Sequence, residues 1–194
     1  MFEFLTLPIL LILVLSGVGL FIWFSYNSLV TLKMRVKEAW ADIDVQLKKR
    51  YDLLPDLIET ARKATVVDED ILTKVTKLRT EAMSEASKNL PPDQRGKVES
   101  QISSALGDIK VQVEAYPDIK SHQELVNLMD KVTEIEEKIA YARRFYNGNV
   151  RDFNTRIKLF PVVIIATFLG FEEEKFFEAT ESEREDIKVD FDKK

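Results

Sequence analysis

Few side chains in this sequence could carry catalysis or bind a metal ion. Its 194 residues include no cysteine and a single histidine, His122. A thiolate nucleophile, a cysteine-ligated metal centre and a His-Glu-x-x-His helix are therefore excluded, and a Ser-His-Asp triad would have to include His122. Because His122 follows Ser121 at an expected helix start, we predict that it is exposed and has no chemical role.

Clustered carboxylates are the remaining candidates for acid–base or metal chemistry. Glu134, Glu136 and Glu137 lie close together, but di-iron bundles bind through Glu-x-x-His pairs and no histidine is near. We predict no catalytic residue, no cofactor and no metal, hence a protein that is not an enzyme; converging carboxylates, as in glycosidases, remain the alternative. The net charge of −5 argues against a nucleic-acid-binding protein, which normally presents a basic face.

Two charged pairs are predicted to hold helices together instead. Arg50 lies on the apolar stripe of its helix, where a buried cation needs a partner. Counting about 14 residues back from the expected tip of each long helix, at 1.5 Å per residue, brings Arg50 opposite Glu136. The same count places Asp44 near Arg143. A ligand pocket is the alternative, but ion pairs that fix helix register are the better attested use.

The elements that position these residues begin with a predicted membrane span. No charged residue occurs between Glu3 and Lys33, and residues 4–24 form an apolar run of about 21 residues, or about 31 Å of helix, which matches a bilayer core. No basic segment precedes the run and no cleavage motif follows it, which favours an uncleaved anchor over a signal peptide. Trp23 and Tyr26 suit an interfacial aromatic belt. Basic residues follow closely, so the positive-inside rule places the N-terminus outside and the body in the cytoplasm.

Helical periodicity dominates the remaining chain. It predicts a helix ending near Ala64, a second beginning at the acidic cluster 68–70, a third that stops before Pro117 and a fourth from Ser121 to Leu159. The first and fourth are the longest, at about 55 and 58 Å. We predict an all-α fold: an N-terminal transmembrane helix followed by an elongated antiparallel bundle of about four helices. The expected domains are the anchor at 1–27, the bundle at 28–160, and a short apolar helix with an acidic tail at 161–194.

Pro55 interrupts the pattern of the first helix. A proline inside a helix removes the hydrogen bond to the carbonyl four residues earlier, here Tyr51, at a cost of about 3 kcal/mol. We predict a kink or break that acts as a fixed bend, with a hinge as the alternative. Asn147 and Asn154, seven residues apart on one flank of the fourth helix, are expected to fix helix register; peptide recognition is the alternative.

A second apolar run, at residues 160–171, falls where two long helices alone would bury their stripes poorly. It is too short to span a bilayer. The preferred interpretation is a short helix packed against the base of the bundle. The alternative is an interfacial foot that dips Phe168, Leu169 and Phe171 into the headgroup region. The three glutamates at 172–174 weaken that alternative, because the anionic inner leaflet repels carboxylates.

Several uncommon strings resemble the bacterial LemA family, and the resemblance covers residues 23–191. They are YNSLV at 26–30, AWADIDVQLKKRYDLLPDL at 39–57, YPDIK at 116–120, ARRFYN at 142–147, GF at 170–171 and FFEA at 176–179, with the signature positions Trp40, Tyr146, Asn147, Asn154 and Pro161. The resemblance implies a single-pass membrane protein with an antiparallel helical body inside the cell and no established enzymatic activity. Some relatives take part in building magnetosome membranes. The chain departs from the family pattern at Asp56 and at residues 66–68.

These observations together favour a non-enzymatic, membrane-anchored helical scaffold or adaptor at the inner face of the bacterial cell membrane. The expected partners are the membrane and a protein of unknown identity, and not nucleic acid. Two alternatives remain: an element that forms homo-oligomers and remodels membranes, and a regulatory subunit of a membrane protease or transporter. The anchor contains Ser16, Gly17 and Gly19 but no strict G-x-x-x-G, which indicates tight helix dimerisation only weakly.

Overall fold

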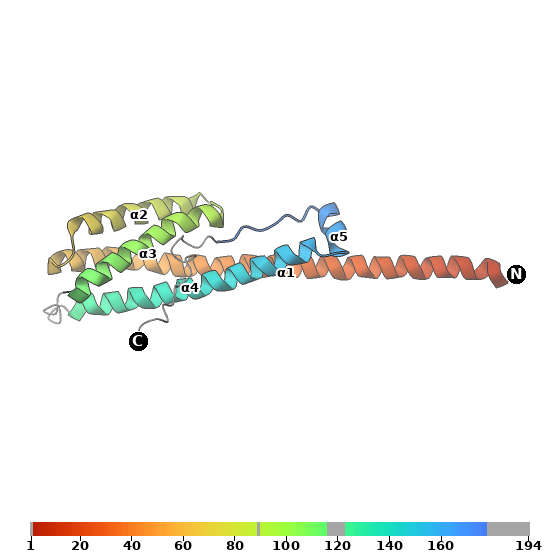
Figure 1. The fold of residues 1–194 in the computed structure, drawn as a ribbon, viewed down its shortest axis with the longest axis horizontal. Coiled ribbons are helices and arrows are strands. Elements are labelled where there is room, and N and C mark those ends of the chain that lie inside the picture. Colours follow the sequence, from red (N-terminus) through yellow and green to blue (C-terminus); the bar gives the residue numbers. More distant parts are fainter. Residues whose placement is uncertain (1, 89, 116–122, 178–194) are drawn as a thin grey trace, which may run out of the picture. The chain divides into compact units, whose positions relative to one another are not determined.

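A computed structural model describes residues 2–88, 90–115 and 123–177 of the chain. All regular secondary structure in this part is helical, which confirms the all-α prediction (Figure 1). The helices are α1 (Phe2–Ala64), α2 (Glu69–Ser87), α3 (Pro92–Ala115), α4 (Gln123–Lys158) and α5 (Val162–Phe168). The predicted helix start at Ser121, the exposed position of His122 and the acidic tail beyond residue 177 lie outside the described residues.

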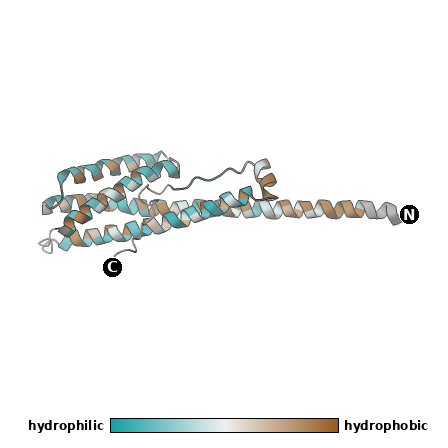
Figure 2. Ribbon diagram, in the orientation of Figure 1, coloured by the Kyte–Doolittle hydropathy of each residue, from teal (hydrophilic) through white to brown (hydrophobic). Residues whose placement is uncertain are grey.

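α1 joins an apolar half to an amphipathic half in one helix of 63 residues. Figure 2 shows the change along the ribbon, from a mostly hydrophobic N-terminal part to mixed polarity. The side chains of residues 8–24 are all exposed. Among the described residues, α1 is the helix whose length and composition would let it cross a membrane.

The chain divides into two compact units that differ from the predicted domains. Of the described residues, unit 1 comprises 2–41 and 145–174, and unit 2 comprises 42–144 and 175–177. Unit 1 forms because the second half of α4, α5 and the segment after it pack on residues 25–41 of α1.

In unit 2, four helical segments bury a shared apolar core. α2 and α3 lie antiparallel and side by side (Figure 1). The core includes Ile43, Leu47, Leu54 and Leu57 of α1, Leu72 and Val75 of α2, Ile102 and Ile109 of α3, and Leu125 of α4. These residues recur at helical spacing along their helices, as expected for the apolar stripes of amphipathic helices. Burying one aliphatic side chain contributes about 1.5–3 kcal/mol, so the stripes are the main stabilising feature of this unit.

In unit 1, α5 packs on α1 and α4 and helps to bury apolar side chains that two helices alone would leave exposed. The buried residues are Leu29, Val36 and Ala39 of α1, Tyr146, Val150, Phe153 and Ile157 of α4, and Val162 and Ala166 of α5. The preferred prediction for residues 160–171 was a short helix packed on the bundle. One face of α5, formed by Val162 and Ala166, is packed in this way.

α5 ends in a Schellman motif that turns the chain back onto unit 1. Gly170 adopts a positive φ of 71°, the Phe171 amide donates to the Ala166 carbonyl at 2.9 Å, and the Gly170 amide donates to the Thr167 carbonyl at 3.2 Å. Phe171 then packs edge-on against Tyr26 and Phe153, each with ring centroids 6.3 Å apart. The foot alternative required Phe168, Leu169 and Phe171 to be exposed. Phe168 and Leu169 are exposed, but Phe171 is part of the packed unit.

Pro55 does not break α1, which continues through it to Ala64. The carbonyl of Tyr51, which loses its helical donor to the proline, accepts a hydrogen bond from Arg79 Nε of α2 at 2.7 Å. A side chain from a neighbouring helix thus replaces the missing backbone donor.

Candidate functional site

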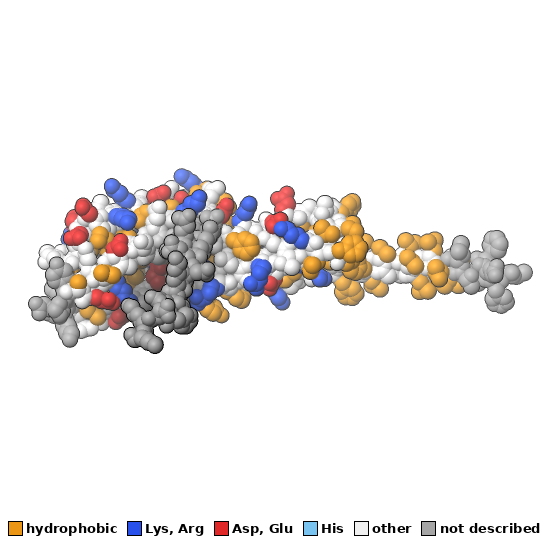
Figure 3. All heavy atoms as spheres, viewed as in Figure 1, with side chains coloured by type: hydrophobic (Ala, Val, Ile, Leu, Met, Phe, Trp, Pro, Cys, Tyr) orange, Lys and Arg blue, Asp and Glu red, His pale blue; other side chains and the backbone are white. Residues whose placement is uncertain are grey.

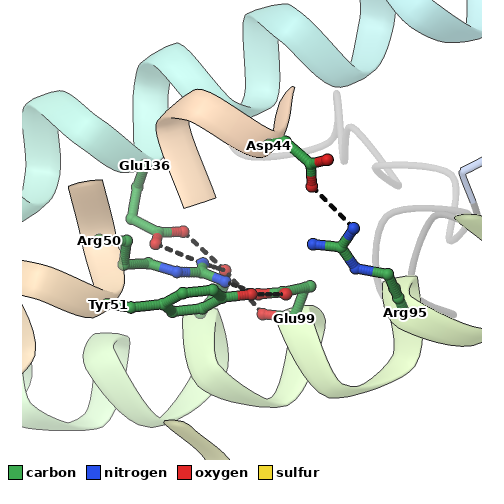
Figure 4. A network of polar contacts seen from close by, with 7 residues as sticks. Asp44, Arg50, Tyr51, Arg95, Glu99 and Glu136 are labelled. Carbon is green, nitrogen blue, oxygen red and sulfur yellow. Dashed lines mark hydrogen bonds and ion pairs between the residues drawn. The ribbon is translucent and has the colours of Figure 1, made fainter. Parts of the chain in front are cut away.

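Among the residues whose burial the structure describes, the largest fully buried side chain is that of Arg50, which is 1% exposed in unit 2. Its Nη1 donates to Glu136 Oε1 of α4 at 2.7 Å and to Ser103 Oγ of α3 at 3.0 Å. Its Nη2 donates to Glu99 of α3 (Figure 4). One guanidinium therefore joins three helices, and the structure brings together Arg50 and Glu136, the two residues that the sequence count paired.

Glu99 is the buried carboxylate at the centre of this cluster. It accepts hydrogen bonds from Arg50 and from the Tyr51 hydroxyl. Burial would lower the pKa of Arg50, but the carboxylates of Glu136 and Glu99 outweigh it and raise that pKa above its ordinary value. Burial and the neighbouring Glu99 carboxylate likewise raise the pKa of Tyr51. Arg50 thus stays charged and Tyr51 neutral at physiological pH.

Ser103 closes the network between α3 and α4. Its hydroxyl accepts from Arg50 and donates to Glu136 Oε2 at 2.6 Å. Both oxygens of Glu136 are therefore bonded, one by the guanidinium and one by the hydroxyl. A buried ion pair is stabilising only when its remaining hydrogen-bonding groups are satisfied, and this cluster largely meets that condition.

Asp44 has a partner that the sequence count did not predict. Asp44 Oδ1 lies 2.7 Å from Nη1 of Arg95, a buried residue of α3 (Figure 4). The guanidinium carbon of Arg143 lies 4.9 Å from the ring centroid of Phe177. The count along the two long helices ignored α3, which presents its own arginine to this face of α1.

The sequence reasoning missed Tyr51, Arg95, Glu99 and Ser103. A signal was present, because Arg95 and Glu99 fall seven residues before Ile102 and Leu106 on the predicted apolar stripe of α3. Charged residues on such a stripe are buried only when they are paired, so the stripe alone indicated partners on facing helices.

The signature residues Trp40, Tyr146 and Asn154 lie in unit 1. The rings of Trp40 and Tyr146 contact each other with centroids 5.4 Å apart. The buried Asn154 side chain donates to the Glu174 carbonyl and accepts from the Glu174 amide, both at 2.9 Å. Asn154 therefore holds a segment of its own chain that follows α5. Asn147 is half-buried on the same helix, and Pro161 stands between α4 and α5.

A surface depression of about 370 Å³ lies between α1 and α4 in unit 2. Charged groups line it: Lys49, Asp52, Lys131, Glu134 and Lys138. Glu134 is bonded to Lys138 at 2.5 Å, and this bond lowers the pKa of that carboxylate. A general acid needs the opposite shift. Among the described residues, no group of three or more histidine or acidic side chains is arranged to hold a metal ion.

Comparisons with known proteins give a consistent result. A model described as the LemA family matches residues 39–191. The magnetosome protein MamQ 2 of Paramagnetospirillum magneticum is 25% identical over 176 residues, which are 79% of this chain and 64% of that protein. Protein LemA of Metamycoplasma hominis is 26% identical over 182 residues, 92% of this chain and 81% of its own length. The magnetosome protein MamQ of Magnetospirillum gryphiswaldense is 22% identical over 198 residues, which cover 88% of this chain and 72% of that protein. This chain thus spans less than two thirds of the length of MamQ 2.

Proposed function

The chain belongs to the LemA family, and on this premise we propose that it is a non-enzymatic scaffold or adaptor. It is anchored by the first part of α1 in the inner bacterial membrane. Its helical body stands on the cytoplasmic face, where it binds another protein or organises the membrane.

The continuity of α1 is the observation that carries this proposal. Residues 8–24 are exposed and apolar, and the same helix goes on to bury Leu29, Val36 and Ile43 in the body. An exposed apolar surface of this extent is unfavourable in water and favourable in a bilayer. Any partner bound by the body is thereby held at the membrane.

The bonding of the two carboxylates in the cluster supports a role without catalysis. Buried Glu99 accepts hydrogen bonds from Arg50 and Tyr51, and both oxygens of the partly exposed Glu136 accept hydrogen bonds from Arg50 and Ser103. Their hydrogen-bonding capacity is thus used to join the helices. Exposed apolar side chains such as Val111 of α3 and Tyr141 of α4 provide surface for a protein partner instead.

The similarity to magnetosome proteins favours a second candidate. In that case, copies of the chain assemble with one another and shape the membrane that anchors them. The two candidates differ in what the body contacts: a foreign protein or another copy.

Photo-crosslinking in the native membrane separates these candidates. A photoreactive amino acid is placed at Val111 or Tyr141 of the full chain, with the exposed charged position Lys77 as the matched control. We expect irradiation to produce a reproducible product with one foreign protein, identified by mass spectrometry. A product of twice the chain's mass would support self-assembly. No product beyond that seen at Lys77 would count against both.

A further inference from the structure

α5 has two apolar faces, and unit 1 covers only one of them. Val162 and Ala166, four residues apart, are each 2% exposed. On the other side, Ile164 and Phe168 follow the same spacing and are 62% and 89% exposed, and Phe160, in the turn just before α5, is 81% exposed. Figure 3 shows hydrophobic side chains gathered around α5 and the neighbouring part of α1. The outer face therefore has no cover within the described part of unit 1.

The contacts of Phe171 fix where α5 is held along α1. Its ring packs against Tyr26, and Lys33 Nζ lies 6.0 Å from its centroid. Tyr26 stands at the end of the exposed apolar stretch, and Lys33 is the first charged residue after it. The two are separated by about 10 Å of helix, which is close to the depth that an interfacial helix occupies at the boundary between headgroups and acyl chains.

From this position we infer that α5 is an interfacial foot. Phe160, Ile164 and Phe168 insert into the surface of the same bilayer that α1 crosses, so the occupant of the outer face is lipid. The inference rests on the proposed membrane anchoring. The ring contact between Phe171 and Tyr26 holds α5 beside the end of the exposed apolar stretch of α1, and this position distinguishes the outer face from a scattered exposed residue.

The acidic segment after α5 is compatible with this placement. Of its three glutamates, Glu173 pairs with Lys158 at 2.8 Å and Glu174 pairs with Lys33 at 3.5 Å. The two hydrogen bonds from Asn154 hold the backbone at Glu174 against α4. Two lysines thus offset charge that would otherwise be repelled by anionic lipid.

A foot of this kind would orient the body on the membrane. A single spanning helix leaves the attached body free to rotate about the helix axis and to tilt. A second contact at α5 restricts both motions, because Val162 and Ala166 tie the foot to unit 1. The membrane would then present a defined side of this unit to partners.

Fluorescence quenching by labelled lipids tests the inference on the full chain. The sequence contains no cysteine, so single-cysteine variants can be labelled without removing native thiols. An environment-sensitive dye is attached at Phe168→Cys, with Leu13→Cys as the reference in the span and Tyr141→Cys as the reference on the body. The vesicles contain phosphatidylethanolamine, phosphatidylglycerol and a lipid with a quencher near the headgroup.

We expect the dye at Phe168→Cys to lose fluorescence to the headgroup quencher, while the dye at Tyr141→Cys does not. Quenching at Leu13→Cys by a quencher deep in the acyl chains reports the anchor independently. If Leu13→Cys is quenched and Phe168→Cys is not, the foot is overturned and the anchor stands. If Leu13→Cys is not quenched by the deep quencher, the anchoring in the proposed function fails. Energy transfer between labelled Phe168→Cys copies without lipid quenching would overturn the foot in favour of a second copy on this face.

Discussion

At the scale of single residues, the main feature of the protein is a charge cluster in an apolar core. Arg50 has carboxylate partners on two other helices, Glu99 on α3 and Glu136 on α4. Two buried charges cost several kcal/mol each to desolvate, so such a cluster adds little net stability over well-packed apolar residues. Removal of one member of the cluster, however, leaves the remaining charges without a partner inside the core.

Substitution of Arg50 tests this asymmetry. Arg50→Ala leaves Glu99 and Glu136 without their cation and should lower the free energy of unfolding by about 3–5 kcal/mol. Denaturant unfolding of the full chain in detergent measures the change. Arg62→Ala is the matched control, because the Arg62–Glu69 pair is exposed and solvent screening should make its loss far less costly than that of Arg50. Equal effects of the two substitutions would contradict the burial of Arg50.

Tyr51 provides a pH-dependent test of the same cluster. The unfolded chain releases a tyrosine proton near a pKa of about 10, whereas folded Tyr51 retains its proton to higher pH because of burial and Glu99. Unfolding therefore releases this proton above pH 10, and the contribution of Tyr51 to stability should fall by about 1.4 kcal/mol per pH unit there.

The variant Tyr51→Phe isolates that contribution. At pH 7 it should be less stable than the parent by about 1.5–3 kcal/mol, the value of a hydrogen bond to a charged group. The stability gap should narrow as the pH rises above about 10. Unfolding curves of both proteins across this range measure it, and a gap that stays constant would argue against a raised pKa.

The sequence could predict part of this cluster. Arg50 and Glu136 lie on the two long helices, whose lengths alone set their relative register, so counting residues was enough. Arg95 and Glu99 lie on α3, whose register depends on the turn that joins it to α2 near Pro91 and Pro92. No periodicity argument gives the geometry of that turn, and the pairing of Asp44 with Arg95 was therefore not predicted.

At the scale of elements, local sequence explains where a helix ends at a glycine, but it does not explain why a helix continues through a proline. Gly170 ends α5 because a positive φ is accessible to glycine at little cost. Pro55 does not end α1, because Arg79 on another helix replaces the lost donor. A local reading of proline predicts the missing hydrogen bond correctly and cannot predict which distant side chain restores it.

Two glycines in this chain should respond to alanine with opposite signs. Gly170→Ala forces a side chain into the left-handed region and should lower stability by about 1 kcal/mol or slightly more. Gly148 lies inside α4, where an added Cβ meets nothing within 4 Å, so Gly148→Ala should raise stability by about 0.5–1 kcal/mol. Thermal unfolding of both variants measures this. Stabilisation by Gly170→Ala would contradict the Schellman motif.

A double-mutant cycle tests the replacement of the backbone donor at Pro55. Arg79→Ala should cost about 1–3 kcal/mol, because the partly buried Tyr51 carbonyl loses its donor. In the Pro55→Ala background the helix supplies its own amide, so the same Arg79→Ala substitution should cost less. Denaturant unfolding of the four proteins gives the coupling energy. A cost that is equal in both backgrounds would mean that Arg79 stabilises α2 by another route.

At the scale of the whole molecule, α1 connects the proposed membrane anchor to the charged body. The exposed apolar residues end near Tyr26, and the basic residues Lys33, Arg35 and Lys37 follow within three turns. Lysine and arginine beside a span set its orientation, whereas nearby acidic residues contribute little, so the net charge of −5 does not oppose the assignment. The body is therefore expected in the cytoplasm and the N-terminus outside.

Cysteine accessibility in cells tests this topology. Tyr141→Cys places the only thiol of the chain on the exposed surface of α4, since the native sequence has none. A membrane-impermeant maleimide should leave it unlabelled in intact spheroplasts and label it after the membrane is opened with detergent. A cysteine added before Met1 should already be labelled in intact spheroplasts. The about 21 apolar residues between the two sites are enough to cross the bilayer once. Labelling of Tyr141→Cys in intact spheroplasts would invert the topology and would place the body, and any partner it binds, on the outer side.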